Sequence, residues 1–348
     1  MTTTITHDLF KQMPKADLHR HYDGCIRPSS IIEIAKEQNI ELPTYDLNEL
    51  NKLVMMTNDC ESLVQYLKAF DIINLVLQTK DNIERTMFEC CEDAYLDGCT
   101  YVEFRFAPIQ STNKGLSMKE VMEACIAGVK KAEKKYGIVV RLIVCAMRHL
   151  SEEESLKAAQ LAVEFKNDHV VGFDLAGPEN GFMPSRHKKA CQYAFDHGIH
   201  ITIHAGEAAG YESVDDAIKN HAERIGHGVR LLENKETIKN VIENKVIVEC
   251  CLTSNIQTKA INKMEDHPIL QLMELGIPCT INTDNTTVSS CSLSGEDELF
   301  TNLFGFSNEQ IVELIMNSFR AAFIEDESIR TKLIQDAYTK MRQLKVIV

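Results

Sequence analysis

Two histidines near the N-terminus, His19 and His21, are spaced so that they could bind one metal ion together. They close an apolar run, and in a β-strand residues two apart point to the same face. Neutral imidazole nitrogens are good ligands for zinc, and two of them leave room for further ligands from elsewhere in the chain. Such a pair also occurs on ordinary surfaces and in ordinary cores. The pair therefore predicts half of a metal site, which other residues must complete.

Further side chains with possible chemistry follow apolar runs later in the chain. An apolar strand that finishes in His, Asp or Glu places polar groups beside a core, where a metal ion or a substrate usually compensates them. The polar ends are His19-Arg20-His21-Tyr22-Asp23-Gly24, Asp174-Leu175-Ala176-Gly177, His204-Ala205-Gly206-Glu207, Gly226-His227-Gly228, Thr253-Ser254-Asn255 and Asn282-Thr283-Asp284-Asn285.

The elements that must position these groups are short apolar runs alternating with amphipathic stretches, a pattern typical of parallel strands buried on both faces. Helix starts are marked by Ser117-x-x-Glu120 and Ser151-x-x-Glu154, in which hydroxyl and carboxyl can satisfy free backbone donors reciprocally. We expect eight strands, at Lys15 to His21, Tyr101 to Ala107, Val139 to Met147, Val170 to Leu175, His200 to His204, Arg224 to His227, Val246 to Cys251 and Cys279 to Thr283.

Eight strand and helix units that close on themselves make a (β/α)₈ TIM barrel, an α/β fold of about 250 residues whose chemistry lies at the C-terminal ends of the strands. The chain has 348 residues, roughly 100 more than such a barrel needs. Most of this surplus falls between the first two strands, where residues 29–98 hold several helix-like segments. We expect this helical insertion to form a lid near the barrel mouth. No linker or break in composition interrupts the chain, which predicts a single domain over residues 1–348.

The composition excludes several classes of function. The chain has 37 Lys and Arg against 51 Asp and Glu, a net charge of -14, which argues against a nucleic-acid partner. It has no run of about 18 apolar residues and no basic and apolar blocks at the N-terminus, so we expect no membrane association and a cytoplasmic location. The 12 scattered cysteines include no Cys-x-x-Cys, and they are expected to be reduced and mostly buried.

Four of the motifs, taken in order and spacing, resemble the signature set of the adenosine deaminase family. They are His19-Arg20-His21-Tyr22-Asp23-Gly24, His204-Ala205-Gly206-Glu207, Ile225-Gly226-His227-Gly228 and Thr283-Asp284, and they span nearly the whole chain. The resemblance implies a (β/α)₈ barrel of the amidohydrolase group with one zinc ion. It adds a small-molecule substrate, a purine nucleoside, which the residues alone do not indicate.

Carried over position by position, the resemblance makes His19, His21, His204 and Asp284 the zinc ligands. Three imidazoles and a carboxylate form a nitrogen-rich set that suits zinc. The run ending at Asp174 lacks the lysine through which many barrel amidohydrolases hold two metals, so a single ion is favoured. The family pattern also implies that a protonated Glu207 donates to N1 of the purine while His227 orients or deprotonates the attacking water. A structural hydrogen bond is the alternative role for either residue.

Substrate-binding residues follow from the same resemblance. Gly177 is similar to the family's backbone donor to purine N3, although it could simply allow a turn. Asp23 resembles the contact to a ribose hydroxyl, although it could cap the next segment. The resemblance implies that His21 contacts the substrate at the metal. It also implies that Tyr66, Leu67 and Phe70 make apolar contacts to the nucleoside, although this helical face could equally belong to the core.

Position 285 departs from the commonest family pattern, which has a second aspartate there to contact purine N7. Asn285 can still donate an amide N–H to N7 without being protonated, which predicts a different pH dependence. The other histidines have no comparable setting and are expected at the surface or in packing: His7, His149, His169, His187, His197, His200, His221 and His267.

The expected function is zinc-dependent deamination of adenosine, and of 2′-deoxyadenosine, to the inosine counterpart in purine salvage. The alternative is a deaminase of another 6-aminopurine such as adenine or 5′-methylthioadenosine. Free adenine deaminases typically carry Glu where this chain has Asp23, and near the first motif only Arg20 and Arg27 could hold the phosphate of AMP. A non-catalytic or extracellular nucleoside-binding barrel is a third possibility, against which the intact Glu207 and His227 argue.

Overall fold

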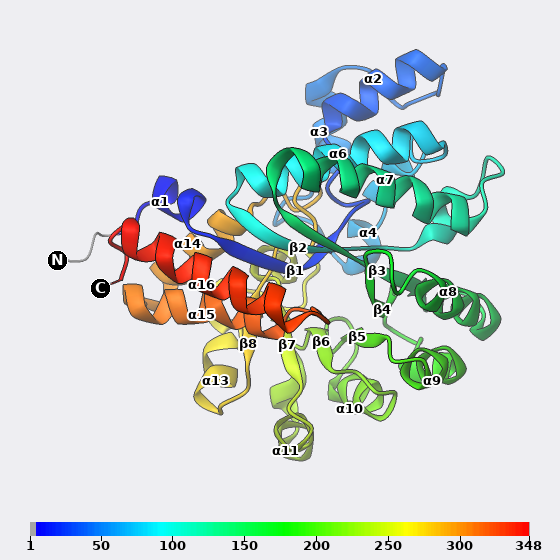
Figure 1. Ribbon diagram of the computed structural model, residues 1–348. Helices are drawn as coiled ribbons and strands as arrows, with labels where there is room; N and C mark the ends of the chain where they lie inside the picture. Colours follow the sequence, from blue (N-terminus) through cyan, green and yellow to red (C-terminus); the bar gives the residue numbers. More distant parts are fainter. Residues whose placement is uncertain (1–4, 348) are drawn as a thin grey trace.

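Eight parallel strands form the centre of the molecule in the computed structural model, which describes residues 5–347. They follow one another around the sheet in chain order, as a (β/α)₈ barrel requires (Figure 1). The strands are β1 (Lys15–His21), β2 (Cys99–Phe106), β3 (Val139–Met147), β4 (Val170–Ala176), β5 (His200–Ala205), β6 (Arg224–His227), β7 (Ile247–Cys250) and β8 (Cys279–Ile281). Each predicted strand is confirmed, with bounds that differ by at most two residues.

The last strand meets the first at the end that carries the predicted chemistry. Beyond β8 the backbone pairs with β1 through an isolated parallel bridge between Arg20 and Asp284. The His21 N–H donates to the Asp284 carbonyl at 2.7 Å, and the Asp284 N–H donates to the His19 carbonyl at 2.8 Å. The closure of the barrel therefore brings the first and last predicted metal ligands together.

Helices surround the strands, as the alternating pattern predicts (Figure 1). Outside the insertion they are α1 (His7–Gln12), α7 (Met118–Tyr136), α8 (Glu152–Glu164), α9 (Lys188–Asp196), α10 (Tyr211–Lys219), α11 (Lys235–Glu243), α12 (Leu252–Gln257), α13 (Ile269–Glu274), α14 (Leu293–Phe304), α15 (Asn308–Ala321) and α16 (Glu327–Gln343). Short 3₁₀ turns lie at Pro108–Ser111, Pro184–His187, Leu231–Glu233 and Met264–Asp266.

The two predicted capping boxes differ. At α7, the Ser117 hydroxyl accepts from the Glu120 N–H while the Glu120 carboxylate accepts from the Ser117 N–H, so the box is confirmed. At α8 only the Ser151 hydroxyl caps, and the reciprocal contact was wrongly predicted. The Glu154 carboxylate instead accepts from Lys157 one turn later, at 2.7 Å, because an ammonium at this spacing competes for it.

The segment between β1 and β2 contains five helices, as the surplus length suggested. They are α2 (Pro28–Gln38), α3 (Leu47–Val54), α4 (Leu63–Tyr66), α5 (Ala69–Ile73) and α6 (Lys80–Leu96). Helix α6 packs along α7, and α2 and α3 project from the barrel at the top of Figure 1. The short helices α4 and α5 contribute side chains to the pocket described below.

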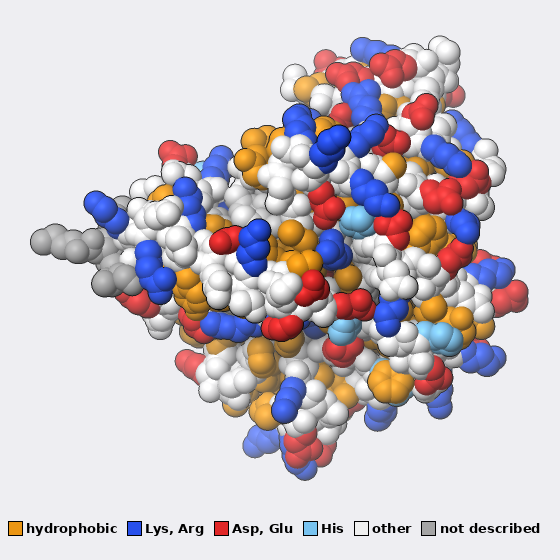
Figure 2. All heavy atoms as spheres, in the orientation of Figure 1, with side chains coloured by type: hydrophobic (Ala, Val, Ile, Leu, Met, Phe, Trp, Pro, Cys, Tyr) orange, Lys and Arg blue, Asp and Glu red, His pale blue; other side chains and the backbone are white. Residues whose placement is uncertain are grey.

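All 12 cysteines are free thiols, and only Cys291 is more than slightly accessible to solvent, which confirms the prediction of reduced, mostly buried cysteines. Within residues 5–347 no helix combines the length and the apolar character needed to cross a bilayer. On the face shown in Figure 2, acidic and basic side chains are interspersed without a large basic area.

Candidate metal centre and active site

Four predicted metal ligands converge at the mouth of the barrel. One donor atom from each of His19, His21, His204 and Asp284 lies within 4.8 Å of the others. The His21 and His204 Nε2 atoms are 3.1 Å apart, and Asp284 Oδ1 lies 3.4 Å from the Nε2 atoms of both His19 and His21. Lone-pair donors this close together repel one another unless a cation or a proton lies between them, so this cluster is compatible with a metal site.

Close packing at one glycine and a left-handed backbone at the aspartate make this convergence possible. A Cβ atom at Gly226 of β6 would fall 2.8 Å from His19 Cε1, so only glycine leaves room for the imidazole. Asp284, three residues beyond the end of β8, has φ 60°, a conformation that non-glycine residues adopt rarely. Such an outlier is typical of functional positions, where the surrounding structure enforces it.

Buried carboxylates orient two of the imidazoles. His19 Nδ1 donates to Glu249 Oε2 at 2.8 Å, and His204 Nδ1 donates to Asp174 Oδ2 at 3.0 Å. With the proton on Nδ1, the Nε2 lone pair points into the cluster, where His19 Nε2 is buried without a hydrogen-bond partner among the described residues. The donor set and this unpaired atom both fit a metal ion.

One arginine links these two carboxylates beneath the centre. The fully buried Arg105 contacts Asp174 Oδ2 at 3.2 Å and Glu249 Oε2 at 2.9 Å. Burial raises the pKa of Asp174, but the His204 imidazole and the Arg105 guanidinium outweigh it and hold this pKa well below its usual value. Both carboxylates are therefore anionic acceptors for the ligand imidazoles.

The two predicted catalytic residues face each other beside the metal cluster. His227 Nε2 lies 3.6 Å from Glu207 Oε2, and both side chains are buried. Burial raises the pKa of Glu207, because desolvation disfavours the carboxylate, which favours the protonated form. The loop that carries Glu207 is held by Glu179, whose carboxylate accepts the backbone N–H groups of residues 206–209 at 2.6–3.0 Å.

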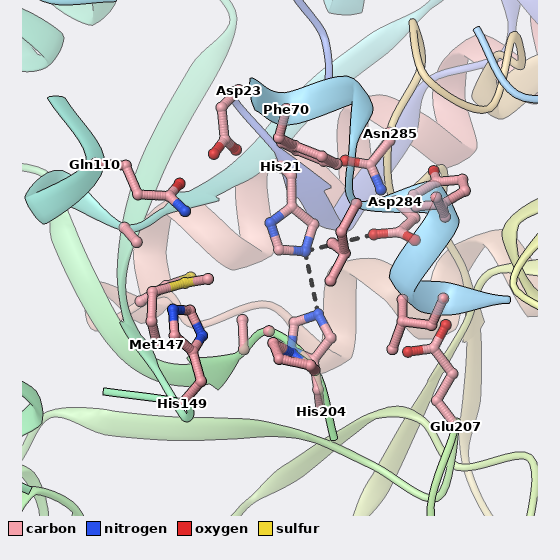
Figure 3. Close-up of a pocket in the computed structure, with 18 of the residues that line it drawn as sticks. His21, Asp23, Phe70, Gln110, Met147, His149, His204, Glu207, Asp284 and Asn285 are labelled. Carbon is pink, nitrogen blue, oxygen red and sulfur yellow. Dashed lines mark hydrogen bonds and ion pairs between the residues drawn. The ribbon is translucent and has the colours of Figure 1, made fainter. Parts of the chain in front are cut away.

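Glu207 and His227 line one cavity of about 360 Å³ together with His21, His204 and Asp284 of the metal cluster, and this volume is within the usual range for a small-molecule site (Figure 3). Tyr66, Leu67 and Phe70, at the ends of α4 and α5, line it as predicted. The Tyr66 side chain is buried and its hydroxyl lies 2.6 Å from Ser289 Oγ. The insertion therefore forms part of the cavity wall.

The other predicted binding residues also line the cavity. Asp23 is 7% exposed and its Oδ1 has no hydrogen-bond partner in the described chain, while burial raises its pKa to about 7. Gly177 has φ 96°, so it also makes the turn after β4. Asn285 is buried against Gly24, where a Cβ would fall 1.7 Å from Asn285 Oδ1.

Several site residues were missed from the sequence. Gln110 and His149 line the cavity, and the prediction that His149 is merely a surface or packing residue was incomplete, because it is exposed at the cavity itself (Figure 3). Glu249 could have been found as a carboxylate inside an apolar run. Asp174 and Asn255 stand in polar strand ends that the sequence did reveal, but without a role.

The chain matches one protein family over most of its length. Residues 14–340 match the family model described as adenosine deaminase. A probable adenosine deaminase of Dictyostelium discoideum is 43% identical over 97% of this chain, which spans only 44% of that relative's length. An adenosine deaminase of Clostridium botulinum is 40% identical over 95% of this chain and 98% of its own.

Two solved structures share the fold. The N6-methyl-AMP deaminase of Arabidopsis thaliana has a TM-score of 0.87 at 29% identity, covering 97% of this chain and 100% of its own. An adenine deaminase of Arthrobacter aurescens also reaches 0.87, at 24% identity, over 95% of this chain and 99% of its own, which speaks for the fold alone. From the family match and the two adenosine deaminase relatives, we conclude that this chain is an enzyme of the adenosine deaminase family.

Proposed function

We propose that this enzyme catalyses the zinc-dependent hydrolysis of adenosine, and of 2′-deoxyadenosine, to the corresponding inosine with release of ammonia, a reaction of purine salvage. The observation that carries the proposal is one cavity in which a four-ligand metal cluster stands beside the buried pair of Glu207 and His227. Water adds at C6 of the purine, the bond from C6 to the amino nitrogen breaks, and ammonia leaves a 6-oxo purine.

His19, His21, His204 and Asp284 would hold one zinc ion. When bound, zinc would lower the pKa of a coordinated water far below that of bulk water, towards about 7, which supplies a nucleophile at neutral pH. A site for a single ion is favoured because Arg105, a cation, occupies the space between the two carboxylates beneath the cluster. A second metal there would meet a guanidinium.

Glu207 would act on the purine ring, and His227 would act on the attacking water. A Glu207 kept protonated by its buried setting donates to N1 of the purine, which lets the ring accept electrons as C6 is attacked. His227, whose Nε2 is directed towards Glu207, contacts the attacking water.

The cavity wall would recognise the nucleoside. We assign the unpaired Asp23 Oδ1 to a ribose hydroxyl, the Gly177 backbone N–H to N3 and the Asn285 amide to N7. Leu67 and Phe70, with Tyr66 behind them, would pack on the nucleoside, so that residues 29–98 serve as a lid on a single domain.

Two features favour adenosine over its rivals. Adenine lacks the ribose that would pair the buried Asp23 carboxyl, and an unpaired buried acceptor costs about 1–3 kcal/mol. Among the described residues, no lysine or arginine lines the cavity, whereas Asp23 and Asp71 do. The phosphate of AMP would therefore have no cationic partner there and would lie near acidic side chains. 5′-Methylthioadenosine keeps the ribose and remains the closest alternative.

The test is ammonia release from adenosine, adenine, AMP and 5′-methylthioadenosine by the zinc-loaded protein. We expect the highest kcat/KM with adenosine, loss of activity with a chelator, and recovery on adding zinc. No ammonia from any of the four would overturn the function, and fastest release from adenine or 5′-methylthioadenosine would replace the substrate.

A further inference from the structure

Three hydrogen bonds run from the backbone of α13 to the catalytic imidazole. The Ile269 N–H donates to His267 Nδ1 at 3.2 Å, and His267 Nε2 lies 3.2 Å from Asn255 Oδ1. The Asn255 Nδ2 atom lies 3.0 Å from His227 Nδ1. All three side chains are at most 3% exposed, so water does not compete for these contacts.

These three contacts form a relay from Ile269 through His267 and Asn255 to His227. The contact farthest from His227 fixes which atom donates and which accepts in each of them. A backbone N–H can only donate, so His267 Nδ1 must accept and the His267 proton must sit on Nε2. Burial lowers the pKa of His267 to about 3, which keeps the ring neutral. His267 Nε2–H then donates to the Asn255 carbonyl oxygen, which leaves the Asn255 NH₂ group facing His227.

The consequence for His227 is opposite to that for the metal ligands. The Nδ1 atoms of His19 and His204 face carboxylates, which can only accept, so the lone pair of each ring lies on Nε2. The Nδ1 atom of His227 faces an amide donor, so the proton of the neutral ring lies on Nε2. Partner polarity therefore separates His19 and His204, two of the proposed metal ligands, from His227.

The backbone at His227 indicates that its orientation is imposed. His227 has φ 69°, in the left-handed region that non-glycine residues adopt infrequently. The next residue, Gly228, anchors this conformation by donating its N–H to the Ala205 carbonyl at 3.1 Å. The ring is thus held between a strained backbone and the Asn255 amide.

We propose that Asn255 and His267 are positioning residues that fix His227 as an Nε2–H donor, so that His227 holds the oxygen of the attacking water and does not remove its proton. The second half of this inference rests on the proposed function, whereas the tautomer does not. With its proton on Nε2, His227 can orient the water but cannot deprotonate it, because a base would need the Nε2 lone pair free.

The first test is the tautomer itself. Protein labelled with ¹⁵N-histidine and loaded with zinc is measured by long-range ¹H–¹⁵N correlation at a pH near 8, with His227→Gln and His267→Gln used to assign the rings. We expect His227 and His267 in the Nε2–H form. An Nδ1–H form of either ring overturns the proposal, whatever the activity.

The second test compares two replacements of His267. Gln keeps a donor for the Asn255 oxygen, whereas Met has a similar volume and none. We expect kcat within about threefold of the wild type for His267→Gln and at least roughly tenfold lower for His267→Met, with KM and zinc content unchanged in both. Equal kcat for the two variants would assign His267 to packing alone and overturn the positioning role.

A buried histidine outside the relay provides the matched control. His187 is 1% exposed and is not among the residues that line the cavity; its ring lies 2.7 Å from Ser155 Oγ and 2.9 Å from the Arg148 carbonyl. We expect His187→Met to lower the melting temperature without the kcat loss of His267→Met, and an equal kcat loss would contradict a specific role for the relay. No ammonia from adenosine with wild-type protein would overturn the proposed function and leave the tautomer measurement valid.

Discussion

His227 Nε2 lies 3.6 Å from Glu207 Oε2, and neither side chain is more than 5% exposed. This relationship places a donor and a carboxyl of raised pKa on the same side of the metal cluster, where C6 and N1 of a purine would be adjacent to them. Both residues line the same cavity, so a purine bound there would contact them together.

The first prediction concerns Glu207. Glu207→Gln keeps the size and a hydrogen-bonding end of the side chain but cannot hand a proton to N1, so kcat should fall about 10²- to 10⁴-fold. The zinc content should stay at the wild-type level, because Glu207 is outside the ligand cluster. The matched control, Glu212→Gln on the exposed side of α10, should remain within about twofold. A Glu207→Gln enzyme with nearly full turnover would remove the assigned proton donor.

The second prediction concerns Asp174, which orients His204 without joining the cluster. Asp174→Asn replaces an anionic acceptor with a neutral one, so zinc affinity should fall about 10- to 100-fold. Competition with a chelator measures the dissociation constant, and the exposed Asp196→Asn on α9 should leave it unchanged. Equal affinities for the Asp174 variant and the wild type would show that the carboxylate does not support the metal site.

The third prediction tests the contact of Asn285 with N7. Asn285→Ala should lower kcat/KM for adenosine about tenfold, and 7-deazaadenosine should cause a similar loss with the wild type. If the amide and N7 contact each other, the variant should lose little more on the deaza substrate, since the two losses are then not additive. Fully additive losses would separate Asn285 from N7.

The same position should alter the pH profile. Asn285→Asp can donate to N7 only while its carboxyl is protonated, so its kcat/KM should decline with rising pH more than that of the wild type. Parallel profiles for the two enzymes would argue that position 285 does not act as a donor.

The fourth prediction concerns stability and a buried carboxyl away from the metal cluster. Glu296 of α14 is 2% exposed and accepts hydrogen bonds from the Thr253 N–H, at 3.0 Å, and from its hydroxyl. Burial raises its pKa from 4.5 to about 7, so the folded protein holds this proton more tightly than the unfolded chain. The resulting stabilisation is complete below about pH 4.5 and is lost as the pH rises through about 7.

Glu296→Gln is neutral at every pH and isolates this effect. The free energy of unfolding of the variant, minus that of the wild type, should rise between pH 5 and pH 8 by at most about 3 kcal/mol. Urea denaturation of both zinc-loaded proteins at each pH measures the difference. A difference that does not change with pH would mean that Glu296 is already ionised in the folded protein.

The sequence by itself determined the barrel and the polar strand ends, and its resemblance to a known family supplied the roles predicted for the metal cluster and for Glu207 and His227. Strand ends that carry His, Asp and Glu can be read from local patterning, and parallel strands of a barrel deliver their C-terminal ends to one mouth. His19 and Asp284 are far apart in the chain, yet both could be placed at that mouth because the strand order alone brings them there.

Only the tertiary structure decided which ring nitrogen of each imidazole carries the proton. His19 meets Glu249, and His227 meets Asn255 and, through it, His267; these partners come from elements with no shared periodicity or motif. The direction of a hydrogen bond depends on the polarity of the atom opposite, at distances near 3 Å, which spacing along the chain cannot specify. The difference between a metal ligand and a water-orienting donor therefore lies in long-range contacts that the folded barrel creates.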